Sequence, residues 1–142
     1  MSVKQISIFL ENRFGRLYEV TKSLGANGIN ILGISVSDGS EYSVVRLIVD
    51  DTEKARMVLK EKGFTSKETN VCVLELDDRP GSLAEMLKSL VDQEMNIDYV
   101  YCLHKRAGDR ALIVIKTGEV EQAIGALKAA GYRCLGVEEI IN

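Results

Sequence analysis

The chain has 142 residues, of which 46% are apolar, and a formal net charge of -3 at pH 7. This composition predicts a soluble globular protein and excludes a disordered tail. No run approaches the roughly 18 consecutive apolar residues of a membrane span, and the N-terminus does not read as a leader, so we expect a cytoplasmic protein with no membrane partner. The acidic balance, with a pI near 5.3, argues against nucleic-acid binding.

An internal repeat organises the chain. The stretch LENRFGRL begins at Leu10 and the similar stretch LDDRPGSL begins at Leu76, and the same offset of 66 pairs ten identical residues among the 22 positions from 10 to 31. Further along the chain the offset becomes 68, which places two extra residues in a turn of the second copy. We therefore predict two domains of similar size, residues 1–69 and residues 70–142.

The hydrophobic periodicity changes in the same order in both copies. The first copy predicts a strand over 6–10, a helix from 17, two hairpin strands over 31–36 and 42–49, a helix ending at Gly63 and a strand over 65–69. The second copy predicts a strand over 72–76, a helix from 83, two hairpin strands over 97–103 and 110–115, a helix ending at Gly131 and a strand over 134–141. The β-α-β-β-α-β order is typical of the ferredoxin-like α+β unit, an antiparallel sheet with both helices on one face.

The opposite face of each predicted sheet also carries apolar residues. Val44 and Ile48 in the first copy, and Leu112 and Val114 in the second, alternate with the residues expected to face the helices. A unit of this size buries too little surface to be comfortably stable alone. We expect the two copies to pack as a pseudo-symmetric pair.

The stretch DRPGSL at 78–83 predicts a tight strand-to-helix turn. Pro80 fixes a backbone angle near the helix start, Gly81 lets the chain turn, and Leu83 is the first core anchor. Such a turn leaves helix-start N–H groups unpaired, with the positive end of the helix dipole behind them. The turn therefore predicts a site for a small anion such as a carboxylate.

The repeat order, this turn and the Asn-Ile pairs at 30–31 and 96–97 resemble the ACT domain in tandem, over essentially the whole chain. ACT domains are regulatory modules that bind amino acids at interfaces between domains, and the resemblance implies that the ligand contacts come from the turns and the two asparagines. These residues are Asn12, Arg13, Phe14, Gly15, Arg16, Leu17 and Asn30 in the first copy, and Asp78, Arg79, Pro80, Gly81, Ser82, Leu83 and Asn96 in the second.

The chemistry of these residues suits an amino acid. Turn N–H groups with Arg13 or Arg16 can hold an α-carboxylate, and the amides of Asn30 and Asn96 supply donors and acceptors. The plainer alternative is that the asparagines satisfy local turns and the arginines are solvated. Because Phe14 and Arg16 replace Pro80 and Ser82, we expect the two turns to differ and one of them to be silent.

The predicted function is therefore a non-enzymatic regulator, without a cofactor, that senses a small amino acid. We expect a homodimer, because exposed sheet surface is costly and ACT ligands sit between domains. A sensor without an output domain also needs a partner, and a metabolic enzyme or another regulator would supply it. The alternative is a ligand-free interaction module that uses the same surfaces to dimerise or to dock on a metabolic enzyme.

Other kinds of site find weak support. Cys102 and His104 lie two positions apart, but two ligands do not close a metal site, and the odd number of cysteines argues against a disulfide framework. Acidic pairs such as Asp77 and Asp78 are explained by turns, so we expect no catalytic or metal residues. Tyr99 and Tyr101 resemble the stacking aromatics of RNA-binding sheets, but the acidic charge of the chain argues against RNA binding. We therefore expect these tyrosines to be buried or to lie between the domains.

Overall fold

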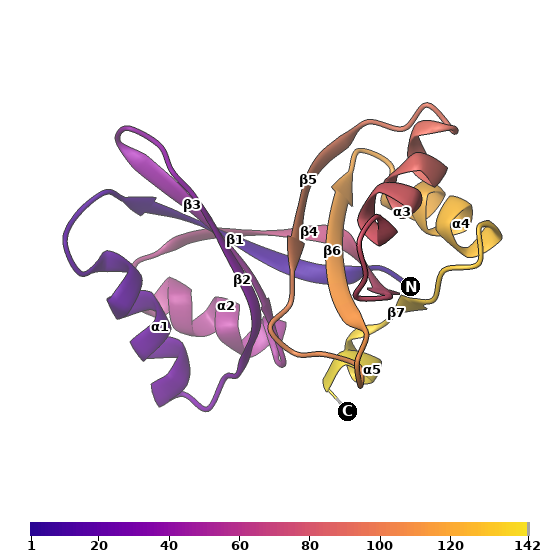
Figure 1. Cartoon of the computed structure of the whole chain (residues 1–142). Helices are drawn as coiled ribbons and strands as arrows, with labels where there is room; N and C mark the ends of the chain where they lie inside the picture. Colours follow the sequence, from indigo (N-terminus) through magenta and orange to yellow (C-terminus); the bar gives the residue numbers. More distant parts are fainter. Residues whose placement is uncertain (142) are drawn as a thin grey trace. The chain divides into compact units, whose positions relative to one another are not determined.

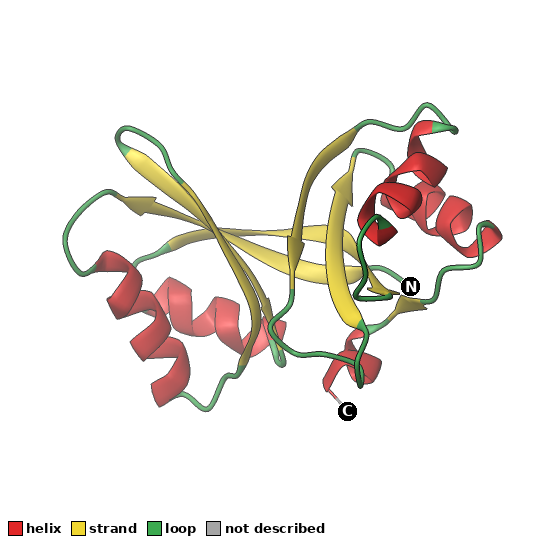
Figure 2. Cartoon of the chain, viewed as in Figure 1, coloured by secondary structure: helices red, strands yellow, loops and turns green. Residues whose placement is uncertain are grey.

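The computed structural model describes residues 1–141, which divide into two compact units. The N-terminal unit comprises Lys4–Thr69, and the C-terminal unit comprises Met1–Val3 and the chain from Asn70 onward. In each unit two helices lie side by side over one face of an antiparallel sheet (Figures 1 and 2). The predicted fold class, two ferredoxin-like α+β units, is confirmed. Among the described residues, no helix is both long and apolar enough to cross a membrane.

The N-terminal unit has the predicted element order. Its elements are β1 (Val3–Glu11), α1 (Arg16–Ala26), β2 (Ile31–Ser37), β3 (Tyr42–Val49), α2 (Thr52–Glu61) and the first part of β4 (Thr65–Leu76). The strand order is β2-β3-β1-β4, with β3 antiparallel to both β1 and β2. β2 is therefore the outermost strand at one side of this sheet.

The core of this unit lies between the sheet and the two helices. Alternate residues of β1 and β3 supply its sheet side, as the period of two predicts. The helices contribute residues spaced by three and four, which places one buried stripe on each helix. The core cluster consists of Ile6, Ile8, Leu10, Val20, Leu24, Ile29, Val45, Leu47, Val49, Ala55, Val58, Leu59 and Phe64.

The C-terminal unit repeats this plan. Its elements are the rest of β4, α3 (Ser82–Val91), β5 (Ile97–Cys102), β6 (Ala111–Thr117), α4 (Val120–Ala129), β7 (Cys134–Leu135) and α5 (Val137–Ile141). The strand order is β5-β6-β4-β7, and all three pairings are antiparallel. The core cluster consists of Cys72, Leu74, Leu76, Met86, Leu90, Ile113, Ile115, Ala123, Ile124, Leu127 and Cys134.

The last predicted strand, over residues 134–141, is wrong beyond its first two residues. After β7 the chain forms the short helix α5, in which Val137, Ile140 and Ile141 have the three- and four-residue spacing of a helix rather than the alternation of a strand. The Glu139 side chain accepts a hydrogen bond from the Gly136 N–H at 3.1 Å and pairs with Arg133 at 2.7 Å. These contacts stabilise the start of the helix and lower the pKa of the Glu139 carboxyl.

A second difference concerns the junction between the repeats. The strands predicted over 65–69 and 72–76 form one continuous strand, β4, because no turn residue interrupts the segment.

Three apolar residues predicted on the sheet faces away from the helices are buried. They are Ile48, Leu112 and Val114, and they lie outside the two core clusters.

Glycine ends three of the helices in a left-handed conformation, and two of them, Gly63 and Gly131, are predicted from the sequence. Gly63 and Gly131 have φ angles of 81° and 93°, and the residue after each donates its N–H back to the last helical turn. Gly28 caps α1 in the same way at φ 74°. Its counterpart after α3 is Glu94, the one non-glycine residue with positive φ among residues 1–141, at 56°.

Candidate functional site

The strand-to-helix turn of the N-terminal unit exposes unpaired backbone donors. Gly15 stands at the N-cap of α1 with φ 85°, a left-handed conformation that favours glycine. No described side chain caps this helix, and the N–H groups of Leu17 and Tyr18 have no acceptor among residues 1–141. The positive end of the helix dipole therefore reaches the surface here, as the sequence predicts.

A hollow of about 230 Å³ lies beside this turn. It combines residues of the turn with residues of the neighbouring strands β2 and β3. Its lining is Leu10, Glu11, Asn12, Arg13, Arg16, Leu17, Val36, Ser43 and Val45. Four of the seven residues predicted for the first copy therefore line one cavity: Asn12, Arg13, Arg16 and Leu17.

Arg16 is the most unusual side chain of this hollow. Its guanidinium lies over the ring of Phe64, 4.5 Å from the ring centroid, and its Nη1 donates to Glu19 at 2.7 Å. Its Nε is buried and has no hydrogen-bond partner among the described residues. A buried donor without an acceptor costs about 1 to 3 kcal/mol, so an anionic oxygen that reached Nε would be bound favourably.

Asn12 has a structural task in the turn. Its Nδ2 donates to the carbonyl oxygens of Gly39 and Ser40, and its Oδ1 accepts from the Ser43 hydroxyl at 2.5 Å. These bonds tie the end of β1 to the hairpin turn between β2 and β3. The amide is thus held in place at the rim of the hollow.

The remaining turn residues are more exposed. Arg13 pairs with Glu11 at 3.1 Å, and both side chains are more than half exposed. Phe14 is fully exposed, and Leu17 is 40% exposed. The side chains of Arg13 and Leu17 therefore border the hollow while Phe14, which does not line it, presents its ring to solvent.

The equivalent turn of the C-terminal unit is built differently. Gly81 again has φ 85° at the helix N-cap, but Ser82 replaces the arginine, is buried, and donates to the Asp77 carbonyl at 2.5 Å. Arg79 pairs with Glu85 at 2.8 Å, and this hydrogen bond lowers the pKa of the Glu85 carboxyl. The Ser82 hydroxyl therefore has an acceptor within its own turn, whereas the Nε of Arg16 has no acceptor among the described residues.

The other predicted residues of this turn lie at the surface. Asp78 pairs with Arg106 of the hairpin turn at 3.1 Å. Pro80 is exposed, and Leu83 is 43% exposed.

The predicted asparagines lie at the other end of each unit. Asn30 directly precedes β2 and exchanges two hydrogen bonds with Asp50 at the end of β3, whereas the turn of residues 12–17 follows β1. The 11 residues of α1 separate them, a helix length of about 16 Å at 1.5 Å per residue. Asn96 has the same place relative to its own turn, before β5 and after α3. Within one unit the structure does not bring turn and asparagine together.

The weaker candidates stay without a site. His104 and Cys102 are exposed, and no group of three or more His, Cys, Asp or Glu among residues 1–141 is arranged to hold a metal ion. Tyr99 and Tyr101 are partly buried, with ring centroids 6.3 Å apart. Cys72 and Cys134 are buried thiols with their sulfurs 3.7 Å apart, a distance that is a contact and not a disulfide bond.

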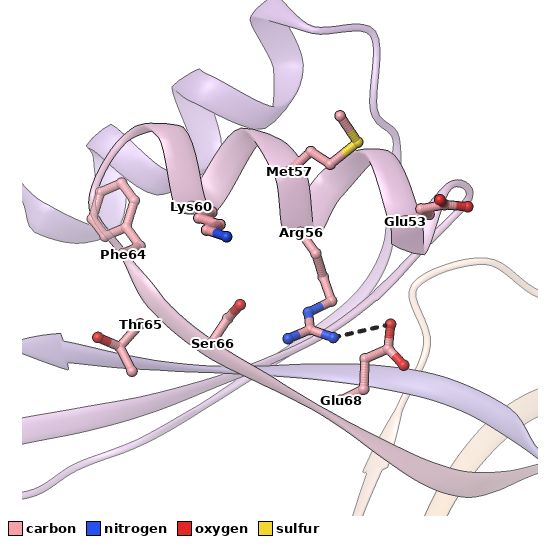
Figure 3. A pocket seen from close by; sticks show the side chains of 8 residues that line it. All are labelled: Glu53, Arg56, Met57, Lys60, Phe64, Thr65, Ser66 and Glu68. Carbon is pink, nitrogen blue, oxygen red and sulfur yellow. Dashed lines mark ion pairs between the residues drawn. The ribbon is translucent and has the colours of Figure 1, made fainter.

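A larger hollow of about 490 Å³, which the sequence did not predict, lies between α2 and β4 (Figure 3). Its lining residues are Glu53, Arg56, Met57, Lys60, Phe64, Thr65, Ser66 and Glu68. Arg56 pairs with Glu68 across it at 3.4 Å, and Lys4 reaches the same carboxylate at 3.5 Å. The four charged lining residues, Glu53, Arg56, Lys60 and Glu68, balance in sign, and none of the lining side chains has a buried polar atom without a partner among residues 1–141. The turn hollow with its unpaired donors is therefore the better candidate for an anion.

Comparison with known proteins assigns the family. The family model described as an ACT domain pair matches residues 1–130. The chain belongs to this family. A crystal structure of a protein from Bacteroides thetaiotaomicron is 32% identical, with a TM-score of 0.91, over 99% of this chain and 96% of that one.

More distant structures share the fold of this ACT domain pair. The ligand-free regulatory subunit of aspartate kinase from Thermus thermophilus is 18% identical with a TM-score of 0.64, over 90% of this chain and 91% of that one. The corresponding subunit from Thermus flavus is also 18% identical with a TM-score of 0.62, over 98% and 92%. Comparison with curated proteins gives no significant match.

Proposed function

We propose that this ACT domain pair is a regulatory, non-catalytic protein that binds a small amino acid at the β1–α1 turn of its N-terminal unit. The observations that carry the proposal are the buried, unpartnered Nε of Arg16 and the free N–H groups of Leu17 and Tyr18 in the first turn of the same helix. An α-carboxylate accepts from all three donors and lies at the positive end of the α1 dipole. The Glu11 carboxylate at the same hollow is an acceptor for the α-ammonium.

We further propose that a second copy of the chain completes this site. β2 is an outer strand, and its residues Ile34 and Val36 are 39% and 50% exposed, an edge that favours pairing with another strand. Two β2 strands related by a two-fold axis pair antiparallel, so the start of one lies beside the end of the other. Val36, near the end of β2, lines the turn hollow, and Asn30 precedes its start. Asn30 of the second copy would therefore lie near the turn.

The experiment is a thermal-shift screen of the purified protein against each proteinogenic amino acid. A ligand at about 100 times its dissociation constant adds roughly 2.7 kcal/mol, or about 5 to 11 °C for a chain of this size. Arg16→Met keeps an unbranched apolar side chain at this position and removes the guanidinium donors, so it should lower this gain, as should Asn30→Ala. Asn96→Ala is the matched control in the other repeat and should leave the gain intact. The proposal fails if no amino acid raises the midpoint, or if Arg16→Met responds like wild type.

The proposed dimer has its own measurement, sedimentation equilibrium at micromolar concentration. The chain mass is 15.7 kDa, so we expect a species of about twice that mass. Ile34→Lys places a charge on the proposed edge and should give the monomer. Val91→Lys changes an even more exposed apolar residue, at the end of α3 in the other unit, and should not. A wild-type monomer would contradict the proposed interface.

The competing function is a ligand-free interaction module that docks on a metabolic enzyme. The exposed apolar side chains of Phe14, Leu17 and Tyr18 at the start of α1 favour it, since clustered exposed apolar residues mark interaction surfaces. It predicts a dimer or a complex with no amino-acid response in the thermal screen. The buried Arg16 donor is what favours sensing over docking alone.

A further inference from the structure

Two buried thiols of the C-terminal unit form a pair. Cys72 lies in β4 and Cys134 in β7, and the strand register places Cys134 opposite Leu74, two residues along β4 from Cys72. Alternate residues of a strand share one face, so both thiols belong to the core cluster between the sheet and the helices. The Cys72 thiol donates to the Cys134 sulfur, and the two sulfurs lie 3.7 Å apart. They are therefore in direct contact.

The first repeat has no counterpart of this pair. The offset of 66 between the repeats places Ile6 at the position of Cys72, and the later offset of 68 places Ser66 at the position of Cys134. Ile6 is a fully buried residue of the first core. The fold therefore does not require a thiol at either position, and the pair is a property of the second repeat alone.

The two strands that carry the thiols differ in how firmly they are held. Cys72 lies within β4 and also pairs with Ile115 of β6. β7 has two residues, and the described chain pairs them with β4 only. A disulfide bond is about 2.0 Å long, so the sulfurs must approach each other by about 1.7 Å. A strand with so few pairings opens and shifts at low cost, so Cys134 is the thiol that moves.

The surroundings favour a thiolate at Cys134. The hydrogen bond from Cys72 lowers the pKa of the Cys134 thiol, and the charges of Lys128 on α4 and of the N-terminal amino group lower it further, whereas burial raises it. The same hydrogen bond, burial and the charge of Glu121 raise the pKa of the Cys72 thiol. One sulfur of the pair is thus prepared to react as a thiolate, and the other holds a proton against it.

We propose that Cys72 and Cys134 are an oxidative modification site, at which hydrogen peroxide closes a disulfide between β4 and β7. Hydrogen peroxide is scarcely larger than water, so it reaches a buried sulfur when the short strand β7 opens locally. The pair lies in the other unit from the β1–α1 turn. The modification therefore does not depend on whether that turn binds an amino acid.

The reaction has two steps. The Cys134 thiolate attacks one peroxide oxygen, so an S–O bond forms, the O–O bond breaks, and the departing hydroxide takes the proton of the Cys72 thiol to give water. The Cys72 thiolate then attacks the sulfur of the Cys134 sulfenic acid, so the S–S bond forms and the S–O bond breaks with loss of a second hydroxide. The two sulfurs lose two electrons in total, and the peroxide is reduced to water and hydroxide.

The disulfide would tie the end of the C-terminal unit to its central strand. Helix α5 begins at Val137, directly after β7 and Gly136, so the bond also restrains this helix. The closed loop runs from residue 72 to residue 134 and contains α3, β5, β6 and α4. Such a loop restricts the unfolded chain, so oxidation should raise the midpoint of thermal unfolding by about 5 to 15 °C.

The experiment treats the folded wild-type protein with hydrogen peroxide, alkylates the remaining thiols in denaturant, and identifies tryptic peptides without reduction. Trypsin separates the two cysteines, since it cleaves after Arg133 and after several lysines between them. We expect a cross-linked pair of peptides that joins Cys72 to Cys134, has lost two hydrogen atoms, and separates on reduction. Protein unfolded before the same treatment is the control and should not prefer this pair over cross-links to Cys102.

Two serine variants test the order of the steps. Cys72→Ser keeps a hydroxyl donor beside Cys134, so oxidation should stop at the Cys134 sulfenic acid, which dimedone traps. Cys134→Ser should leave Cys72 reduced at the same dose, and neither variant should gain thermal stability on oxidation. The proposal is overturned if Cys72 and Cys134 remain thiols at a dose that fully oxidises the exposed Cys102, or if either is found cross-linked to Cys102 instead.

Discussion

Asn12 and Asp78 occupy equivalent positions of the two repeats, and each bonds to the hairpin turn of its own unit. Asn12 donates to the carbonyl oxygens of Gly39 and Ser40 and accepts from Ser43, while Asp78 makes one ion pair with Arg106. The same task is therefore performed by a hydrogen-bond network in one copy and by a surface charge pair in the other.

This difference predicts unequal costs of truncation. Asn12→Ala removes three hydrogen bonds and should destabilise the protein by about 1 to 2 kcal/mol. Asp78→Ala removes one exposed ion pair and should cost about 0 to 1 kcal/mol. Urea denaturation of both variants beside wild type measures the two values, and an equal loss would show that the network around Asn12 adds nothing.

Glu94 should be a stabilising site for glycine. Its φ of 56° is left-handed, and Gly28 stands at the same cap in the first repeat. A left-handed conformation costs about 1 to 2 kcal/mol for a residue with a Cβ, partly offset by the greater freedom of glycine in the unfolded chain. Glu94→Gly should therefore raise the free energy of unfolding by about 0.5 to 1 kcal/mol, measured by denaturation, and Gly28→Glu should lower it.

Arg16 and Phe64 should be energetically coupled. The guanidinium lies 4.5 Å from the ring centroid and is largely shielded from solvent. A double-mutant cycle with Arg16→Gln and Phe64→Leu should give a coupling energy of about 0.5 to 2 kcal/mol, the range for such cation–π contacts. If the stability losses of the two single variants simply add up in the double variant, the contact between Arg16 and Phe64 does not stabilise the protein.

The three thiols should differ in reactivity. Cys102 is exposed, whereas Cys72 and Cys134 are buried and in contact. The hydrogen bond between them and their burial raise the pKa of the Cys72 thiol, which keeps it protonated and unreactive. Iodoacetamide should modify Cys102 alone in the native protein, and all three after unfolding, as read by peptide mass spectrometry. Rapid native modification of Cys72 would contradict this packing.

Glu85 should titrate below the ordinary range because Arg79 hydrogen-bonds to its carboxylate. A carboxyl whose pKa is lower in the folded state contributes stability that is present above its unfolded pKa and is lost as the pH falls through the folded pKa. NMR titration of the carboxyl should show the lowered pKa in wild type and a return toward the ordinary value in Arg79→Ala. Glu139, paired with Arg133, serves as the internal reference and should titrate unchanged.

The sequence predicted the repeated fold well because the apolar spacing is local. Alternation in β1 and β3 and the three- and four-residue spacing in α1 and α3 depend on neighbours a few positions away, so they can be read directly. Helix α5 was missed because its few apolar residues fit two patterns, and a capping contact between Glu139 and Gly136 decides between them.

The site was less predictable because it depends on distant packing. Arg16 was a candidate from the sequence, but its buried Nε depends on Phe64, which lies after α2. The family resemblance groups Asn30 with the turn as ligand contacts, although the 11 residues of α1 separate them within one unit.

The measurement that tests the central claim most directly is complementation between two binding-defective variants. Arg16→Met removes the guanidinium donors of the turn, and Asn30→Ala removes the side chain that the second copy is proposed to contribute. In a two-fold dimer that mixes both variants, one site carries both defects and the other carries neither, so a mixture equilibrated at equal amounts should recover about a quarter of the wild-type turn sites. Calorimetric titration with the amino acid found in the thermal screen counts those sites. Recovery of about a quarter of the sites supports a site shared between two copies. If a mixture that is shown to contain hybrid dimers recovers no binding, the shared site is contradicted.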